Sequence, residues 1–173
     1  TSCEAVGDQA EYIRDGLDYD LWLKNTTRIL DETNANLNIM MTINSLCLFS
    51  ITEFLDQVYK LKQHTGSSSP TVSLNLLRFP SFQSPLALPN HIKDHCHNKL
   101  STWYEANKDK KFWSEYERAS IERLIDYLVT VDAPHRCSTV FYILYCVLHI
   151  VLCAIYCTVC YILYVCYMLY CVL

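Results

Sequence analysis

The residues best suited to chemistry lie early in the chain, between Ser2 and Arg14. The run "SCEAVGDQAEYIR" combines a hydroxyl at Ser2, a carboxylate at Glu4, a turn residue at Gly7 and a guanidinium at Arg14. The planar fork of Arg14 suits a carboxylate, and the Ser2 hydroxyl can both donate and accept a hydrogen bond. This combination predicts a binding loop at the end of a strand.

A second candidate is the cysteine run C-x3-C-x2-C formed by Cys153, Cys157 and Cys160. The last 37 residues hold seven of the ten cysteines, so this spacing arises readily by chance. On a helix the three thiols would share one face, whereas the ligands of an iron–sulfur cluster sit on a loop that wraps the metal. We interpret the run as an accident of composition, not as a metal site.

A third candidate is the histidine-rich stretch "DHCHN". On a helix, His95 and His97 point about 200° apart, which is poor geometry for one ion. His91 and His95 are a better pair, but only Asp94 or Asn98 could complete it. We interpret the stretch as a solvated helix face.

Charge and cysteine usage limit the class of protein. Acids and bases are interspersed, the formal net charge is −4, and no basic stripe indicates a nucleic-acid partner. Cys3, Cys47 and Cys96 are far apart, with no signal peptide ahead of them. This favours a cytoplasmic protein over a secreted disulfide framework.

The C-terminal segment is unlike the rest. Residues 140–173 carry no formal charge, and about 20 helical residues suffice to cross a bilayer. Two features argue against a membrane span: Arg136 is the only basic residue that flanks the segment, and the tyrosines of the segment are scattered throughout it. Its repeated "YILY" and "YCVL" slightly favour a tail translated from repetitive or out-of-frame DNA. We expect an α/β domain over residues 1–130, a linker over 131–139 and an apolar tail, helical or disordered, over 140–173.

Hydrophobic periodicity indicates an alternation of strands and helices in residues 1–130. Residues 2–7 have the pattern of a strand end that runs into a glycine turn, and further strands are predicted over 36–43 and 71–79. Ser50 and Glu53 have capping-box spacing and Gly66 is a helix stop. The predicted helices cover 18–32, 50–66, about 90–103 and about 112–128.

Strands that alternate with helices imply βαβ units and a parallel sheet. Three such strands make half of a barrel or a small open sheet, and we expect neither edge of this sheet to be covered. The incomplete sheet suggests that strands are missing before Thr1.

The run S-x-E-A-V-G-x-x-A-E-Y-I-R-x-G, the later "TIN" and then "LRFPSFQSPLALP" resemble the radical SAM enzymes, among them those with a "twitch" C-terminal subdomain. The likeness covers about residues 1–128. It implies an α/β fold of parallel strands and helices, the C-terminal half of a partial (β/α)6 barrel from the end of its fourth strand. Cys3 stands where the family usually has a larger apolar residue, and the family's cluster motif C-x3-C-x2-C should precede Thr1.

The resemblance implies a fragment of an enzyme that cleaves S-adenosylmethionine reductively to a 5′-deoxyadenosyl radical. Such an enzyme needs a [4Fe–4S] cluster, expected outside this chain, a reductant protein and a small-molecule or peptide substrate. By analogy, Ser2 and Arg14 would hold the methionine part of the cofactor, Glu4 would fix the loop, and Asn44 would lie near the ribose. The alternative is a non-catalytic α/β binding or interaction protein, tethered to a membrane through residues 140–173.

Overall fold

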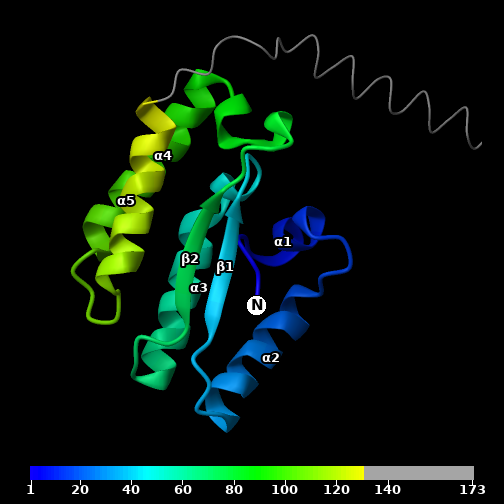
Figure 1. The fold of residues 1–173 in the computed structure, drawn as a ribbon, viewed down its shortest axis with the longest axis vertical. Coiled ribbons are helices and arrows are strands. Elements are labelled where there is room, and N and C mark those ends of the chain that lie inside the picture. Colours follow the sequence, from blue (N-terminus) through cyan, green and yellow to red (C-terminus); the bar gives the residue numbers. More distant parts are fainter. Residues whose placement is uncertain (131–173) are drawn as a thin grey trace, which may run out of the picture. The chain divides into compact units, whose positions relative to one another are not determined.

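The computed structural model describes residues 1–130, which belong to the first of two compact units of the chain, Thr1–Ala133 (Figure 1). The predicted linker and tail, with Cys153, Cys157 and Cys160, lie outside the described residues. In chain order the elements are α1 (Gly7–Ile13), α2 (Tyr19–Glu32), β1 (Asn38–Ile43), the 3-10 turn η1 (Cys47–Phe49), α3 (Ile51–Thr65), β2 (Thr71–Leu76), the 3-10 turns η2 (Ser81–Gln83) and η3 (Pro85–Ala87), α4 (Asn90–Asn107) and α5 (Glu115–Thr130).

The two strands pair in parallel, with Asn38 opposite Thr71 and Ile43 opposite Leu76. On the other edge of β1, Ser2 forms an isolated parallel bridge with Met40. The predicted α/β class with parallel strands is therefore confirmed. The expected first strand, however, is reduced to this single bridge.

The sheet has one apolar and one polar face, because successive side chains of a strand alternate. Ile39, Met41 and Ile43 of β1 are fully buried. They share a core with side chains of α3, α4 and α5, and α3 lies behind the strands (Figure 1). The opposite face is partly exposed and carries mainly small polar side chains beside Met40, namely Asn38, Thr42, Thr71, Ser73 and Asn75.

The prediction that both edges of the sheet are uncovered is wrong for β2. The Val72 N–H on its outer edge donates to the Glu117 carboxylate at 2.8 Å. The Arg123 guanidinium donates to the Leu74 carbonyl oxygen at 3.4 Å. Side chains of α5 thus satisfy backbone groups that a further strand would otherwise pair with, and they close this edge.

Helix ends agree with the sequence where the signal is local. Asp18 caps α2 by accepting from the Leu21 N–H at 2.8 Å, and Gly66 ends α3 with a left-handed φ of 63°. The capping box at Ser50 is wrong, since its hydroxyl makes no capping bond. Glu53 instead pairs with Lys99 of α4 at 2.7 Å.

Two further points concern the ends of the described region. α5 begins at Glu115, three residues after the predicted start near Phe112. Among residues 1–130, no helix is both long and apolar enough to cross a bilayer.

Candidate functional site

Three loops meet at the carboxyl ends of the strands, the upper end of the molecule in Figure 1. The Gln9 side-chain amide of α1 donates to the Leu46 carbonyl oxygen at 2.6 Å. The Ser45 N–H donates to the Gln83 carbonyl oxygen at 2.8 Å, which links the loops after β1 and β2. Parallel α/β folds bind their ligands at this end of the sheet.

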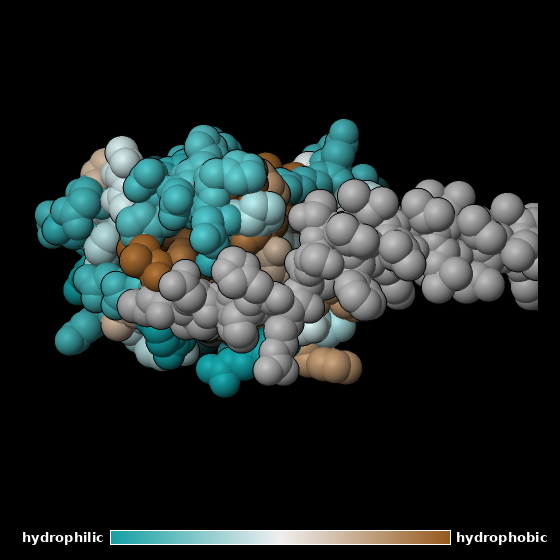
Figure 2. Space-filling view, turned by 90° about the horizontal axis from the view of Figure 1, so that it is seen from above, coloured by the Kyte–Doolittle hydropathy of each residue, from teal (hydrophilic) through white to brown (hydrophobic). Residues whose placement is uncertain are grey.

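Seen from this end, the surface is mostly hydrophilic, with smaller hydrophobic areas between the polar ones (Figure 2). Exposed apolar and aromatic side chains on the three loops are Tyr12, Leu46, Phe49, Phe79 and Phe82. These side chains could contact the apolar part of a ligand, and the loops also carry the polar groups described next.

The predicted loop residues Glu4 and Arg14 form an ion pair at this end of the sheet. Arg14 Nη2 lies 2.6 Å and Nε 3.1 Å from the same oxygen, Oε2 of Glu4. The Glu4 side chain is only 3% exposed and that of Arg14 is 31% exposed. A buried carboxylate is stable only when it is paired or hydrogen-bonded, so Arg14 is a structural partner of Glu4 as well as a candidate ligand contact.

Helix α1, which the sequence did not predict, places Arg14 beside Glu4. Gly7 begins the helix with a φ of 51°, a conformation that favours glycine. Arg14 is the C-terminal cap, and its N–H donates to the Ala10 carbonyl oxygen at 3.0 Å. The helix therefore turns the chain back, so that a side chain ten residues after Glu4 reaches it.

Ser2 and Asn44 sit on neighbouring segments but differ in their surroundings. Ser2 is half-buried, and its bridge to Met40 puts its side chain on the polar face of the sheet. The Asn44 carboxamide oxygen accepts from the backbone N–H groups of Leu46 and Cys47 at 2.9 and 3.0 Å. Asn44 thus shapes the turn after β1, and its side chain is bonded within that turn.

Burial raises the pKa of each thiol in the described residues, which disfavours the thiolate form at neutral pH. Burial raises the pKa of Cys3 to about 11 and that of Cys47 to about 12. Cys96 is buried too, and burial raises its pKa. Since the thiolate is the reactive and metal-binding form, these positions fit a packing role.

A buried ion pair between Lys62 of α3 and Glu117 of α5 was not predicted from the sequence. Both side chains are 0% exposed, and Nζ lies 2.9 Å from Oε1. Lys62 also donates to the Ser68 carbonyl oxygen at 2.6 Å, and Glu117 accepts from the N–H groups of Val72 and Ser114. Because these contacts engage both charged groups, the pair fits a structural role. A lysine near the end of a helix does not indicate in the sequence that such a partner exists.

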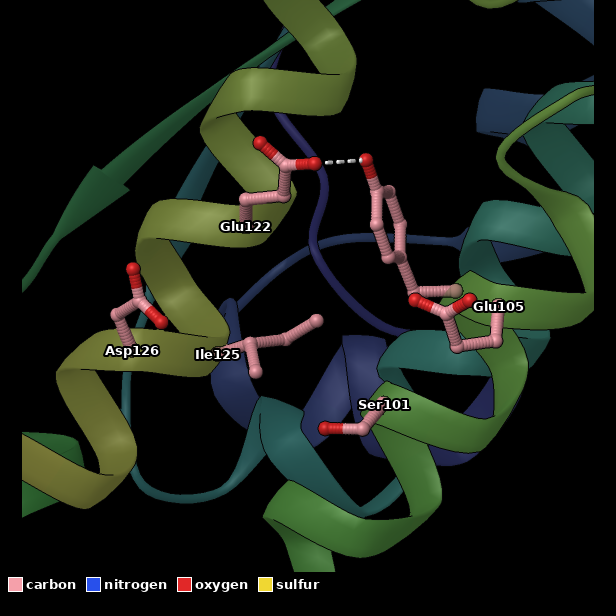
Figure 3. Close-up of a pocket in the computed structure, with 6 residues that line it drawn as sticks. Ser101, Glu105, Glu122, Ile125 and Asp126 are labelled. Carbon is pink, nitrogen blue, oxygen red and sulfur yellow. Dashed lines mark hydrogen bonds between the residues drawn. The ribbon is translucent and has the colours of Figure 1, made fainter.

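A shallow pocket of about 200 Å³ between α4 and α5 was not predicted from the sequence either. The Tyr104 hydroxyl donates to the Glu122 carboxylate at 2.6 Å, the hydrogen bond that is dashed in Figure 3. Burial, together with the hydrogen bond to Glu122, raises the pKa of Tyr104 to about 12. None of the loops after the strands lines this pocket, whose walls are formed by Ser101, Tyr104, Glu105, Glu122, Ile125 and Asp126.

Comparisons with protein-family models, curated proteins and solved structures find no match to this chain. A functional assignment therefore rests on the geometry at the carboxyl ends of the strands and on the sequence motifs found there.

Proposed function

We propose that residues 1–130 are the C-terminal half of a partial (β/α)6 barrel in a radical SAM enzyme, which cleaves S-adenosylmethionine reductively to start radical chemistry. The observation that carries the proposal is the Glu4–Arg14 pair at the carboxyl end of a parallel sheet. Arg14 is anchored on a buried carboxylate and its side chain is still partly exposed, as a carboxylate-binding group requires.

The asymmetry of the sheet supports a half barrel. Side chains of α5 occupy the outer edge of β2, which leaves the side of Thr1–Cys3 for further strands. The polar face, with Ser2, Ser73 and Asn75, suits the wall of a cavity that binds a ligand through hydrogen bonds.

The residues present fit the methionine part of the cofactor. Arg14 would bind the carboxylate, and the half-buried Ser2 hydroxyl would lie beside it. Glu4 would fix the loop, and Asn44 would lie near the ribose, in the turn that its carboxamide holds.

The [4Fe–4S] cluster belongs, in this proposal, to a C-x3-C-x2-C motif before Thr1. Within residues 1–130 no group of three or more Cys, His, Asp or Glu side chains could hold a metal ion. Such a cluster, reduced by a partner protein, would supply the electron that cleaves S-adenosylmethionine to methionine and a 5′-deoxyadenosyl radical, and this radical would abstract hydrogen from the substrate. The substrate class, small molecule or peptide, is left open.

The gene and its full-length product test this proposal. The coding sequence before Thr1 should contain C-x3-C-x2-C after a predicted strand. The full-length protein, reconstituted with iron and sulfide, should be brown and should bind S-adenosylmethionine in a calorimeter. Arg14→Lys should weaken that binding by about tenfold, because the charge remains but the two-pronged geometry is lost. A reconstituted protein that does not bind the cofactor would end the proposal.

A further inference from the structure

The two members of the Glu4–Arg14 pair are buried to different extents, which points to different tasks. Glu4 is 3% exposed and Arg14 is 31% exposed. A carboxylate so enclosed cannot contact a ligand at the surface of the site, whereas the guanidinium beside it can. Glu4 must therefore act on a ligand through Arg14.

The hydrogen bonds use one edge of the guanidinium and leave the other. Nε and Nη2 both donate to Oε2 of Glu4, at 3.1 and 2.6 Å. Nη1, with the second N–H of Nη2, forms the remaining edge, for which residues 1–130 supply no acceptor. Because the group is planar, fixing the first edge also fixes the direction in which the second one points.

The backbone holds both residues of the pair. The Cys3 N–H, next to Glu4, donates to the Met40 carbonyl oxygen of β1 at 3.3 Å. The Arg14 N–H donates to the Ala10 carbonyl oxygen, and the Arg14 carbonyl oxygen accepts from the Leu17 N–H, both at 3.0 Å. The orientation of the free edge is thus set before a ligand arrives, which lowers the entropic cost of binding.

We propose that Glu4 is a positioning residue, which holds Arg14 so that the site selects ligands with a carboxylate over the same ligands without one. The inference rests on the proposed function and deepens it, since the ligand class is an amino acid linked to a nucleoside. In Glu4→Gln, the neutral amide is a weaker acceptor and no longer orients the guanidinium. In Glu4→Asp, the carboxylate is kept but is one methylene further away.

The test compares two probes, S-adenosylmethionine and its decarboxylated form, by calorimetry on the reconstituted full-length protein. The wild type should bind the first more tightly. Glu4→Gln should reduce this preference by about tenfold, through weaker binding of S-adenosylmethionine alone. Glu105→Gln, which removes an exposed carboxylate paired with Lys108, is the matched control and should leave the preference unchanged.

The outcomes separate this inference from the proposed function. If the wild type binds neither probe, the proposed function fails. If it prefers S-adenosylmethionine and Glu4→Gln retains that preference, or weakens both probes equally, only the positioning role of Glu4 is overturned. Should Glu4→Gln not fold, Glu4→Asp gives the same measurement, with the same loss of preference expected and an unchanged preference against the inference.

Discussion

Breaking the Lys62–Glu117 pair should cost more stability than breaking an exposed ion pair of this fold. Both side chains are 0% exposed, and the Glu117 carboxylate also accepts from the Val72 N–H at 2.8 Å. Lys62→Met leaves this carboxylate buried without a counter-charge. Glu117→Gln likewise leaves the ammonium group of Lys62 buried without a counter-charge. Each single change should therefore cost about 3–5 kcal/mol of unfolding free energy.

The double variant should cost less than the sum of the two single changes. Burial lowers the pKa of Lys62 even though Glu117 acts in the opposite direction, so desolvation outweighs attraction at this lysine. Lys62→Met combined with Glu117→Gln buries no charge and keeps an acceptor for the Val72 N–H. We expect a coupling free energy of about 2 kcal/mol or more between the two positions.

Equilibrium urea unfolding of the four proteins, followed by circular dichroism, measures these free energies. Glu53→Gln is the control, because Glu53 forms an exposed pair with Lys99 at 2.7 Å. It should cost less than about 1 kcal/mol. Single variants at Lys62 and Glu117 that cost no more than this control, or whose costs simply add, would refute the reasoning.

Three further predictions concern caps and thiols. Gly66→Ala should lower the free energy of unfolding by about 1 kcal/mol, because Gly66 has a φ of 63°. A higher free energy of unfolding in urea would contradict the left-handed cap. Asp18→Ala should lower the free energy of unfolding by about 1 kcal/mol, because it removes the cap of α2. Ser50→Ala should be neutral or stabilising, since the buried Ser50 hydroxyl has no partner among the described residues. A lower melting temperature for Ser50→Ala than for Asp18→Ala would contradict these assignments. Burial raises the pKa of Cys47 from 9.0 to about 12, so the unfolded thiol ionises first and stability should fall as the pH rises through this range. Cys47→Ala should flatten that fall in unfolding curves between about pH 8 and about pH 10.5, and an unchanged slope would count against the buried thiol.

The sequence predicted those elements whose signals are local. The alternation in residues 36–43 predicted which side chains of β1 are buried, because a two-residue period fixes the face of a strand. Asp18 predicted the start of α2 and Gly66 the end of α3, because each cap depends on backbone groups within a few residues.

What the sequence did not predict depends on distant partners. Helix α1 has seven residues and only Ala10 is buried among them, so it lacks an apolar stripe that periodicity could detect. The capping box at Ser50 failed because Glu53 is bonded to Lys99, a contact between residues 46 positions apart. The closure of the β2 edge by Glu117 spans 45 positions and likewise leaves no local pattern.

The candidate site was predicted in part, since some of its features have local signals in the sequence and others depend on bonding partners. Residue type alone singled out Glu4 and Arg14, and the structure brings the two side chains together. The resemblance to the radical SAM enzymes singled out Asn44, and nothing in the sequence distinguished a ligand contact from the turn that its carboxamide forms with the Leu46 and Cys47 N–H groups. A short polar side chain after a strand suits both roles, so only the bonding partners decide between them.

Arg14 carries both the stability of its loop and the proposed binding, and the two effects need separate measurements. Its guanidinium compensates a carboxylate that is 3% exposed, so replacing it weakens the fold whether or not a ligand binds there. A loss of affinity in one variant therefore cannot assign the site. The ratio of affinities for ligands with and without a carboxylate can assign it. Unfolding weakens the binding of both ligands equally, whereas loss of the free guanidinium edge weakens only the binding of the ligand with a carboxylate.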